Sequence, residues 1–143
     1  MVIALERLQP GLTSVVQQKV SDEHTAKHHG SGALDCLLAT PSYVDMIISA
    51  SVEAVEQYLP KGFITVGRSM EFTHEAPSGL GMTVSVRATL RAVDGNRLFF
   101  DTLAYDEVGE IGQGTHERVV VNRDQLMIKA KERMKDIQRI YLK

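Results

Sequence analysis

The segment from Thr40 to Leu59 restricts the possible folds of this chain more than any other, because it predicts a helix with very little polar surface. Thr40 and Pro41 are typical of a helix start, since a threonine can cap free backbone amides and a proline has no N–H to leave unpaired. Apolar and small residues recur at helical spacing, and the polar residues form only a narrow stripe. We therefore expect the rest of the protein to enclose most of this helix.

Strands that can enclose the helix follow it directly in the sequence. The ranges 63–76, 82–93, 97–105 and 110–121 favour strands, and turn-forming residues such as Asp94-Gly95-Asn96 separate them. The second of these ranges alternates most clearly between apolar and polar residues. This part of the chain therefore predicts a continuous antiparallel sheet.

The flanking segments complete the pattern. Residues 12–20 predict a further strand, and residues 21–38 predict a loop or lid. Asn122 can cap a C-terminal helix, and the apolar stripe expected on that helix is Leu126, Ala130, Met134, Ile137 and Tyr141. The order indicates an α+β fold, in which an antiparallel sheet wraps around one central helix. We expect one domain over residues 1–143, with sheet edges that pair with a second subunit.

The composition is that of a globular protein without an obvious charged partner. Apolar residues make up 43% and charged residues 24%, and the formal net charge is -2, so neither nucleic acid nor a membrane surface is an expected partner. No apolar run is long enough to cross a bilayer or to serve as a secretory signal. Cys36 is the single cysteine and cannot form an internal disulfide, which favours a reducing compartment. We expect a cytoplasmic protein.

Three stretches carry a resemblance to a known family. They are Gly112-x-Gly114-Thr115-His116-Glu117-Arg118, Leu38-Ala39-Thr40 at the helix start, and Gly67 through His74 on the following strand. From Leu38 to Ala130 the chain resembles the fluoroacetyl-CoA thioesterase-like branch of the hotdog thioesterases. The resemblance implies the hotdog fold, an acyl-CoA ligand, no cofactor, no metal, and a site between the subunits of a homodimer. A tetramer is left open.

The resemblance also implies a set of catalytic residues, and this chain departs from it at one position. The family has a threonine at the helix start, a glutamate within the helix and a histidine on the facing strand, which act together on the thioester carbonyl. Thr40 and His74 occupy the first and last of these positions, whereas Ile48 stands where the family has its glutamate. Residues 21–42 also contain none of the lid phenylalanines of the family. Specificity for a fluorinated acyl group is therefore not expected.

His74 is the strongest candidate for the chemistry. Strand alternation places Met70, Phe72 and His74 on one face, and that face is expected to line an apolar cleft against the helix. A neutral imidazole there could act as a general base towards water or as a nucleophile towards the thioester. The alternative is a hydrogen-bonded core histidine without a catalytic role.

The start of the helix is the second candidate. Besides capping, Thr40 could position the substrate, because a helix N-terminus presents free amides to an oxygen that becomes negative during attack. Since Pro41 lacks a donor, the amides of Ser42, Tyr43 and Val44 are expected to supply these contacts.

Asp45 and Arg118 are further candidates with open alternatives. Asp45 lies three residues before Ile48 and could partly compensate for the missing glutamate, or it could simply stabilise the helix dipole. Arg118 could contact a CoA phosphate or amide, or it could pair with a strand carboxylate.

Gly67, Met70, Phe72 and Ile48 complete the expected substrate-binding set. His24, His28 and His29 in the lid suggest a metal site at first sight, but no cysteine or acidic residue shows a recognised metal-ligand spacing with them.

Three functions remain open from the sequence. The leading hypothesis is hydrolysis of a small or medium acyl-CoA thioester by His74 and Thr40. The alternative is a non-catalytic protein that binds acyl-CoA or another small molecule, because Ile48 replaces the acid. A weaker third option is a dehydratase-like reaction on an acyl substrate.

Overall fold

A computed structural model describes residues 5–142 of the chain. Its elements follow the predicted order, with three single-turn 3-10 helices in addition. The elements are β1 (Thr13–Lys19), η1 (Asp22–His24), η2 (Ala26–His28), α1 (Thr40–Val55), η3 (Glu56–Tyr58), β2 (Phe63–Phe72), β3 (Thr83–Asp94), β4 (Arg97–Tyr105), β5 (Glu110–Asn122) and α2 (Arg123–Tyr141).

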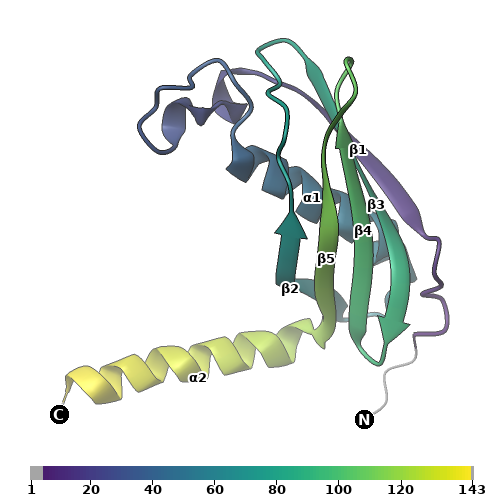
Figure 1. The fold of residues 1–143 in the computed structure, drawn as a ribbon. Coiled ribbons are helices and arrows are strands. Elements are labelled where there is room, and N and C mark those ends of the chain that lie inside the picture. Colours follow the sequence, from purple (N-terminus) through teal and green to yellow (C-terminus); the bar gives the residue numbers. More distant parts are fainter. Residues whose placement is uncertain (1–4, 143) are drawn as a thin grey trace.

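The five strands form one curled antiparallel sheet in the order β1-β3-β4-β5-β2, and α1 crosses its concave face (Figure 1). This arrangement confirms the predicted α+β fold. No helix in the described range is long and apolar enough to cross a membrane.

The core lies between α1 and the sheet. Tyr43, Ile47 and Ala50 of α1 are fully buried, and so are the alternating apolar residues of β3, which include Val84 and Val86. Burial of each large apolar side chain stabilises the fold by roughly 1.5–3 kcal/mol. The apolar faces of the helix and the sheet, which follow from the periodicity of the sequence, therefore pack against each other.

Most of α1 is enclosed, as expected, but one side of the helix is open in the single chain. Ile48 is 37% exposed and Val44 is only half-buried, because the sheet curls around one side of the helix and leaves the other open. An apolar helix face is thus left without cover by the described residues.

The strand after α1 stays close to β5 beyond its formal end at Phe72. The amides of Thr73 and Glu75 donate to the carbonyls of Gln113 and Ile111, at 2.9 and 2.7 Å, so that the pairing continues along the predicted range 63–76. The close approach also explains two glycines of the G-x-G-T-H-E-R stretch. A Cβ on Gly112 would overlap the carbonyl oxygen of Thr73, and a Cβ on Gly114 would overlap that of Glu71.

The C-terminal helix is formed as predicted, but its predicted apolar stripe is exposed except for the half-buried Leu126. Asn122 caps α2 by accepting a hydrogen bond from the amide of Gln125 at 3.0 Å. None of the helix residues is buried, because α2 extends away from the sheet beyond the β2 edge (Figure 1). The sequence pattern therefore gives the helix correctly without giving its place in the molecule.

The contact between β2 and β5 leads to a stability prediction. We expect Gly114→Ala to destabilise the protein by about 3 kcal/mol, since the added methyl group forces the backbones of two paired strands apart. Gly67→Ala is the matched control on β2, because a Cβ there meets only side-chain atoms at 3.5 Å or more. The free energy of unfolding, measured by urea titration, checks both variants. Equal values for the two would contradict this explanation of the glycine.

Candidate functional site

Thr40 and His74 meet at the amino end of α1. The side-chain oxygen Oγ1 of Thr40 lies 2.9 Å from Nδ1 of His74, which is hydrogen-bonding distance. The predicted capping role of Thr40 is wrong, because Ala39 is the N-cap residue and Thr40 is already the first residue of the helix. The hydroxyl group is therefore directed to the imidazole rather than to a free amide of the helix.

The ring of His74 is held by aromatic packing. Tyr43 contacts it edge-on, with 5.2 Å between ring centroids, and Tyr43 contacts Phe72 in the same way at 5.4 Å. Burial lowers the pKa of His74 below its usual value of 6.5, so the ring is neutral at pH 7. Met70, Phe72 and His74 share one half-buried face of the strand as predicted, while Glu71 and Glu75 are exposed on the other.

A cavity of about 290 Å³ opens beside this pair. Thr40 and His74 line it together with largely apolar neighbours from the lid and the turn after His74, namely Ala26, Leu34, Leu37, Leu38, Ala39, Glu75, Ala76 and Pro77. The space is large enough for a small acyl group or part of a thioester chain. His74 is therefore accessible to a ligand, as the catalytic interpretation requires.

The free amides at the helix start differ from the predicted ones. The amide of Tyr43 donates to the carbonyl of Ala39 at 3.1 Å, and Val44 lies one residue deeper in the helix, so neither has a donor left for a ligand. The amides of Thr40 and Ser42 have no hydrogen-bond acceptor among the described residues. Thr40 lines the cavity and Ser42 follows it in the first turn of α1, so both donors lie at the amino end of the helix.

Within one chain, Ile48 and Asp45 do not reach the contact between Thr40 and His74. Ile48 follows Thr40 by eight residues, which places it about 12 Å further along the helix. Asp45 is exposed and forms no hydrogen bond or ion pair with Thr40 or His74. The structure thus does not bring Asp45 into the position of the missing carboxylate.

A second cavity, of about 550 Å³, collects most of the remaining predicted binding residues. It is lined by Ile48, Thr65, Val66, Gly67, Arg68, Ser69, Met70, His116 and Arg118. Arg118 is buried and donates to Oγ1 and to the carbonyl oxygen of Thr65, both at 2.9 Å. Among the described residues it pairs with no carboxylate, which contradicts the structural alternative of the sequence analysis.

The sequence analysis missed a buried pair formed by Ser51 and His116. The hydroxyl of Ser51 donates to the carbonyl of Ile47 at 2.8 Å and lies 3.0 Å from Nδ1 of His116. Burial, assisted by the charge of Arg118, lowers the pKa of His116 to about 4. The only signal in the sequence was a serine on the apolar face of the helix, 65 residues before a histidine in the G-x-G-T-H-E-R stretch.

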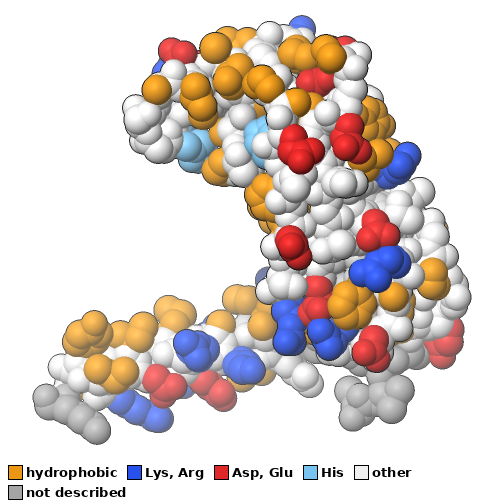
Figure 2. All heavy atoms as spheres, in the orientation of Figure 1, with side chains coloured by type: hydrophobic (Ala, Val, Ile, Leu, Met, Phe, Trp, Pro, Cys, Tyr) orange, Lys and Arg blue, Asp and Glu red, His pale blue; other side chains and the backbone are white. Residues whose placement is uncertain are grey.

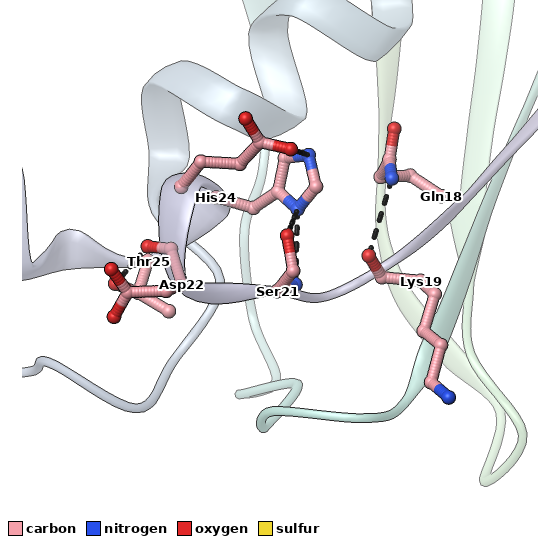
Figure 3. A network of polar contacts seen from close by, with 7 residues as sticks. Gln18, Lys19, Ser21, Asp22, His24 and Thr25 are labelled. Carbon is pink, nitrogen blue, oxygen red and sulfur yellow. Dashed lines mark hydrogen bonds and ion pairs between the residues drawn. The ribbon is translucent and has the colours of Figure 1, made fainter.

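The lid histidines have local structural contacts. Nδ1 of His24 accepts a hydrogen bond from the amide of Ser21 at 3.0 Å, and this bond closes the first turn of the lid (Figure 3). The amide of Ala39 donates to the carbonyl of His24 at 2.8 Å, which ties the lid to the start of α1. His28 and His29 are exposed, and the described residues contain no group of three or more potential metal ligands.

Comparisons with known proteins give a consistent result. Residues 20–124 match the family model described as fluoroacetyl-CoA-specific thioesterase. The fluoroacetyl-CoA thioesterase of Streptantibioticus cattleyicolor is 38% identical over 97 residues, which are 68% of this chain and 70% of that protein. A hot-dog-like protein from Thermanaerovibrio acidaminovorans superposes with a TM-score of 0.83 at 32% identity, covering 90% and 94% of the two chains. A fluoroacetyl-CoA thioesterase variant solved with acetyl-CoA gives 0.83 at 30% identity, covering 88% and 98%.

The buried histidine leads to a prediction about stability and pH. Because the pKa of His116 is about 4 in the folded protein and 6.5 without burial, the unfolded chain binds more protons between these values. We expect the free energy of unfolding to fall by on the order of 3 kcal/mol as the pH decreases from 6.5 to 4. His116→Gln should flatten this dependence, while the exposed control His28→Gln should not. Denaturant titrations across this range check the result, and identical slopes for the two variants would contradict it.

Proposed function

Because the chain belongs to the fluoroacetyl-CoA-specific thioesterase family, we propose that it hydrolyses an acyl-CoA thioester with His74 and Thr40. The single observation that carries the proposal is the 2.9 Å contact between Thr40 and His74 at the mouth of a cavity. A neutral imidazole and a hydroxyl group lie there, next to the amino end of α1 and its free amides, and thioester hydrolysis can use such groups.

The reaction follows from the placement of these groups. When Nδ1–H of His74 donates to Oγ1 of Thr40, Nε2 keeps its lone pair for a water molecule. The water oxygen attacks the thioester carbonyl carbon while its proton passes to Nε2. The carbonyl oxygen becomes negative and is stabilised by the amides of Thr40 and Ser42 at the positive end of α1. The C–S bond then breaks, and the proton on Nε2 passes to the CoA sulfur.

We propose further that the site is completed by a second copy of the chain in a homodimer. The open face of α1 around Ile48 and the outer edge of β2, which pairs only with β5 in the described chain, lie beside the second cavity. In an antiparallel pair of such edges, Ile48, Gly67, Met70 and Arg118 of one subunit would approach Thr40 and His74 of the other. The acyl group would lie between the subunits, and Arg118 would bind its polar end or a CoA amide.

We place the protein in the cytoplasm, where Cys36 would stay reduced.

One observation favours a second candidate function, which is binding without turnover. The family's glutamate is replaced by Ile48, and no other carboxylate contacts His74 among the described residues. A protein of this kind would hold an acyl-CoA in the same cavity and release it unchanged.

Removal of the imidazole tests the leading proposal. We expect His74→Ala to lower the rate of free-thiol release from a panel of short and medium acyl-CoAs by about 10²–10⁴-fold, the usual contribution of a general base. The wild-type rate should fall with decreasing pH through an apparent pKa below 6.5, because only the neutral ring accepts a proton. His28→Ala is the matched control, since it removes an exposed lid histidine. Acyl-CoA binding without thiol release by the wild-type chain would favour the second candidate.

Restoring the carboxylate tests the role of Ile48. We expect Ile48→Glu to raise kcat/KM about tenfold or more, which corresponds to about 1.4 kcal/mol of transition-state stabilisation. Ile48→Gln introduces a side chain of the same shape as glutamate but without the charge, and it should not raise kcat/KM. Thiol release from both variants at one pH provides the measurement. An unchanged rate in Ile48→Glu would mean that another group already fills this role.

A further inference from the structure

Helix α2 is the part of the molecule that neither the fold nor the proposed reaction accounts for. It contains 19 residues, about 28 Å of helix, and none of them is buried. It extends beyond the β2 edge, on the side of the sheet that the proposed second subunit would occupy (Figure 1). An isolated exposed helix is not stable from propensity alone, so a packing partner is expected.

The exposed surface of α2 has both an apolar and a cationic component. The exposed residues of the predicted stripe extend to Met127 in place of the half-buried Leu126. They follow a three-four spacing and form one continuous apolar stripe, which consists of Met127, Ala130, Met134, Ile137 and Tyr141. Met134 is 67% and Ile137 is 53% exposed. The helix also carries six basic and three acidic residues, although the whole chain has fewer basic than acidic residues. The partner should therefore offer apolar contacts and negative charge.

The opposite end of the same chain, around the lid, offers apolar contacts and negative charge. Figure 2 shows a hollow on the β2 side, bounded by the lid above and by α2 below. At the lid end, Leu34 and Leu80 are exposed, and the amide of Leu80 donates to the carbonyl of Cys36. Glu75 and Glu110 are exposed at the same end, where the amide of Glu75 donates to the carbonyl of Ile111, the residue next to Glu110.

We propose that α2 docks on the lid end of a second copy of this chain. Two β2 edges that pair antiparallel around a two-fold axis exchange the ends of the molecule, so that α2 of one copy lies against the lid of the other. The apolar stripe then covers Leu34 and Leu80, and the basic residues face the glutamates around Glu75. The inference rests on the homodimer of the proposed function, and it makes each α2 part of the wall around the partner's His74 cavity.

Cys36 provides a direct test, because it is exposed in the lid and is the only cysteine. The Met134→Cys variant places a second thiol on the apolar stripe of α2. Treatment with a flexible bismaleimide should convert it to a covalent dimer on a denaturing gel, and peptide mapping should show position 36 linked to position 134. The matched control Glu132→Cys has its thiol on the polar face of the same helix and should not cross-link. The covalent dimer should be lost when Cys36→Ser is combined with Met134→Cys.

The other outcomes overturn the inference in distinguishable ways. Links between two copies of position 134 would show helix-to-helix pairing, and a link within one chain would show that α2 folds back. No link in a protein that sedimentation equilibrium shows to be dimeric, and that still releases thiol, would overturn only the docking of α2. A monomer by sedimentation would overturn the homodimer as well.

Discussion

The packing of α1 on the concave face of the sheet is the constraint on which the rest of the structure depends. Tyr43, Ile47 and Ala50 are buried by it, and their positions fix the rotation of the helix about its own axis. With that rotation, the first residue of the helix reaches His74, while Ile48 two turns later faces away from the sheet. The contact between Thr40 and His74 and the uncovered face are therefore two results of the same packing.

Strand β5 fixes the position of α1 along the sheet. Its His116 is bonded to Ser51 in the middle of the helix, and its two glycines let β2 approach so closely that His74 lies beside Tyr43. Glu117 of the same strand pairs with Arg68 of β2 and Arg97 of β4, at 2.8 and 2.7 Å. The G-x-G-T-H-E-R stretch therefore reads most simply as the element that holds the neighbouring strands and the helix in register, and not as a row of catalytic groups.

The sequence predicts the elements of this fold well, because periodicity and turn residues are local properties. Prediction from the sequence fails where the outcome depends on a shift of one residue or on contacts between residues that are distant in the chain. The threonine-proline pair marks the start of α1 correctly, but the helix begins one residue earlier than a capping threonine would allow, and the free amides shift with it. The bond between Ser51 and His116 joins positions 65 residues apart, and no local pattern contains it. The pattern of α2 predicts an amphipathic helix but is silent on what its apolar face contacts.

The replacement of the family's glutamate by Ile48 also changes the electrostatics of the site. Burial lowers the pKa of His74. A carboxylate near the ring would act in the opposite direction, because a negative charge stabilises the imidazolium. Without a carboxylate the ring remains a weaker base that is uncharged over a wider pH range, and in the proposed reaction the imidazolium would gain no stabilisation from a nearby anion. In the proposed reaction, transition-state stabilisation would then fall mainly to the amides of Thr40 and Ser42, whose positions are set by the start of the helix and do not depend on residue 48.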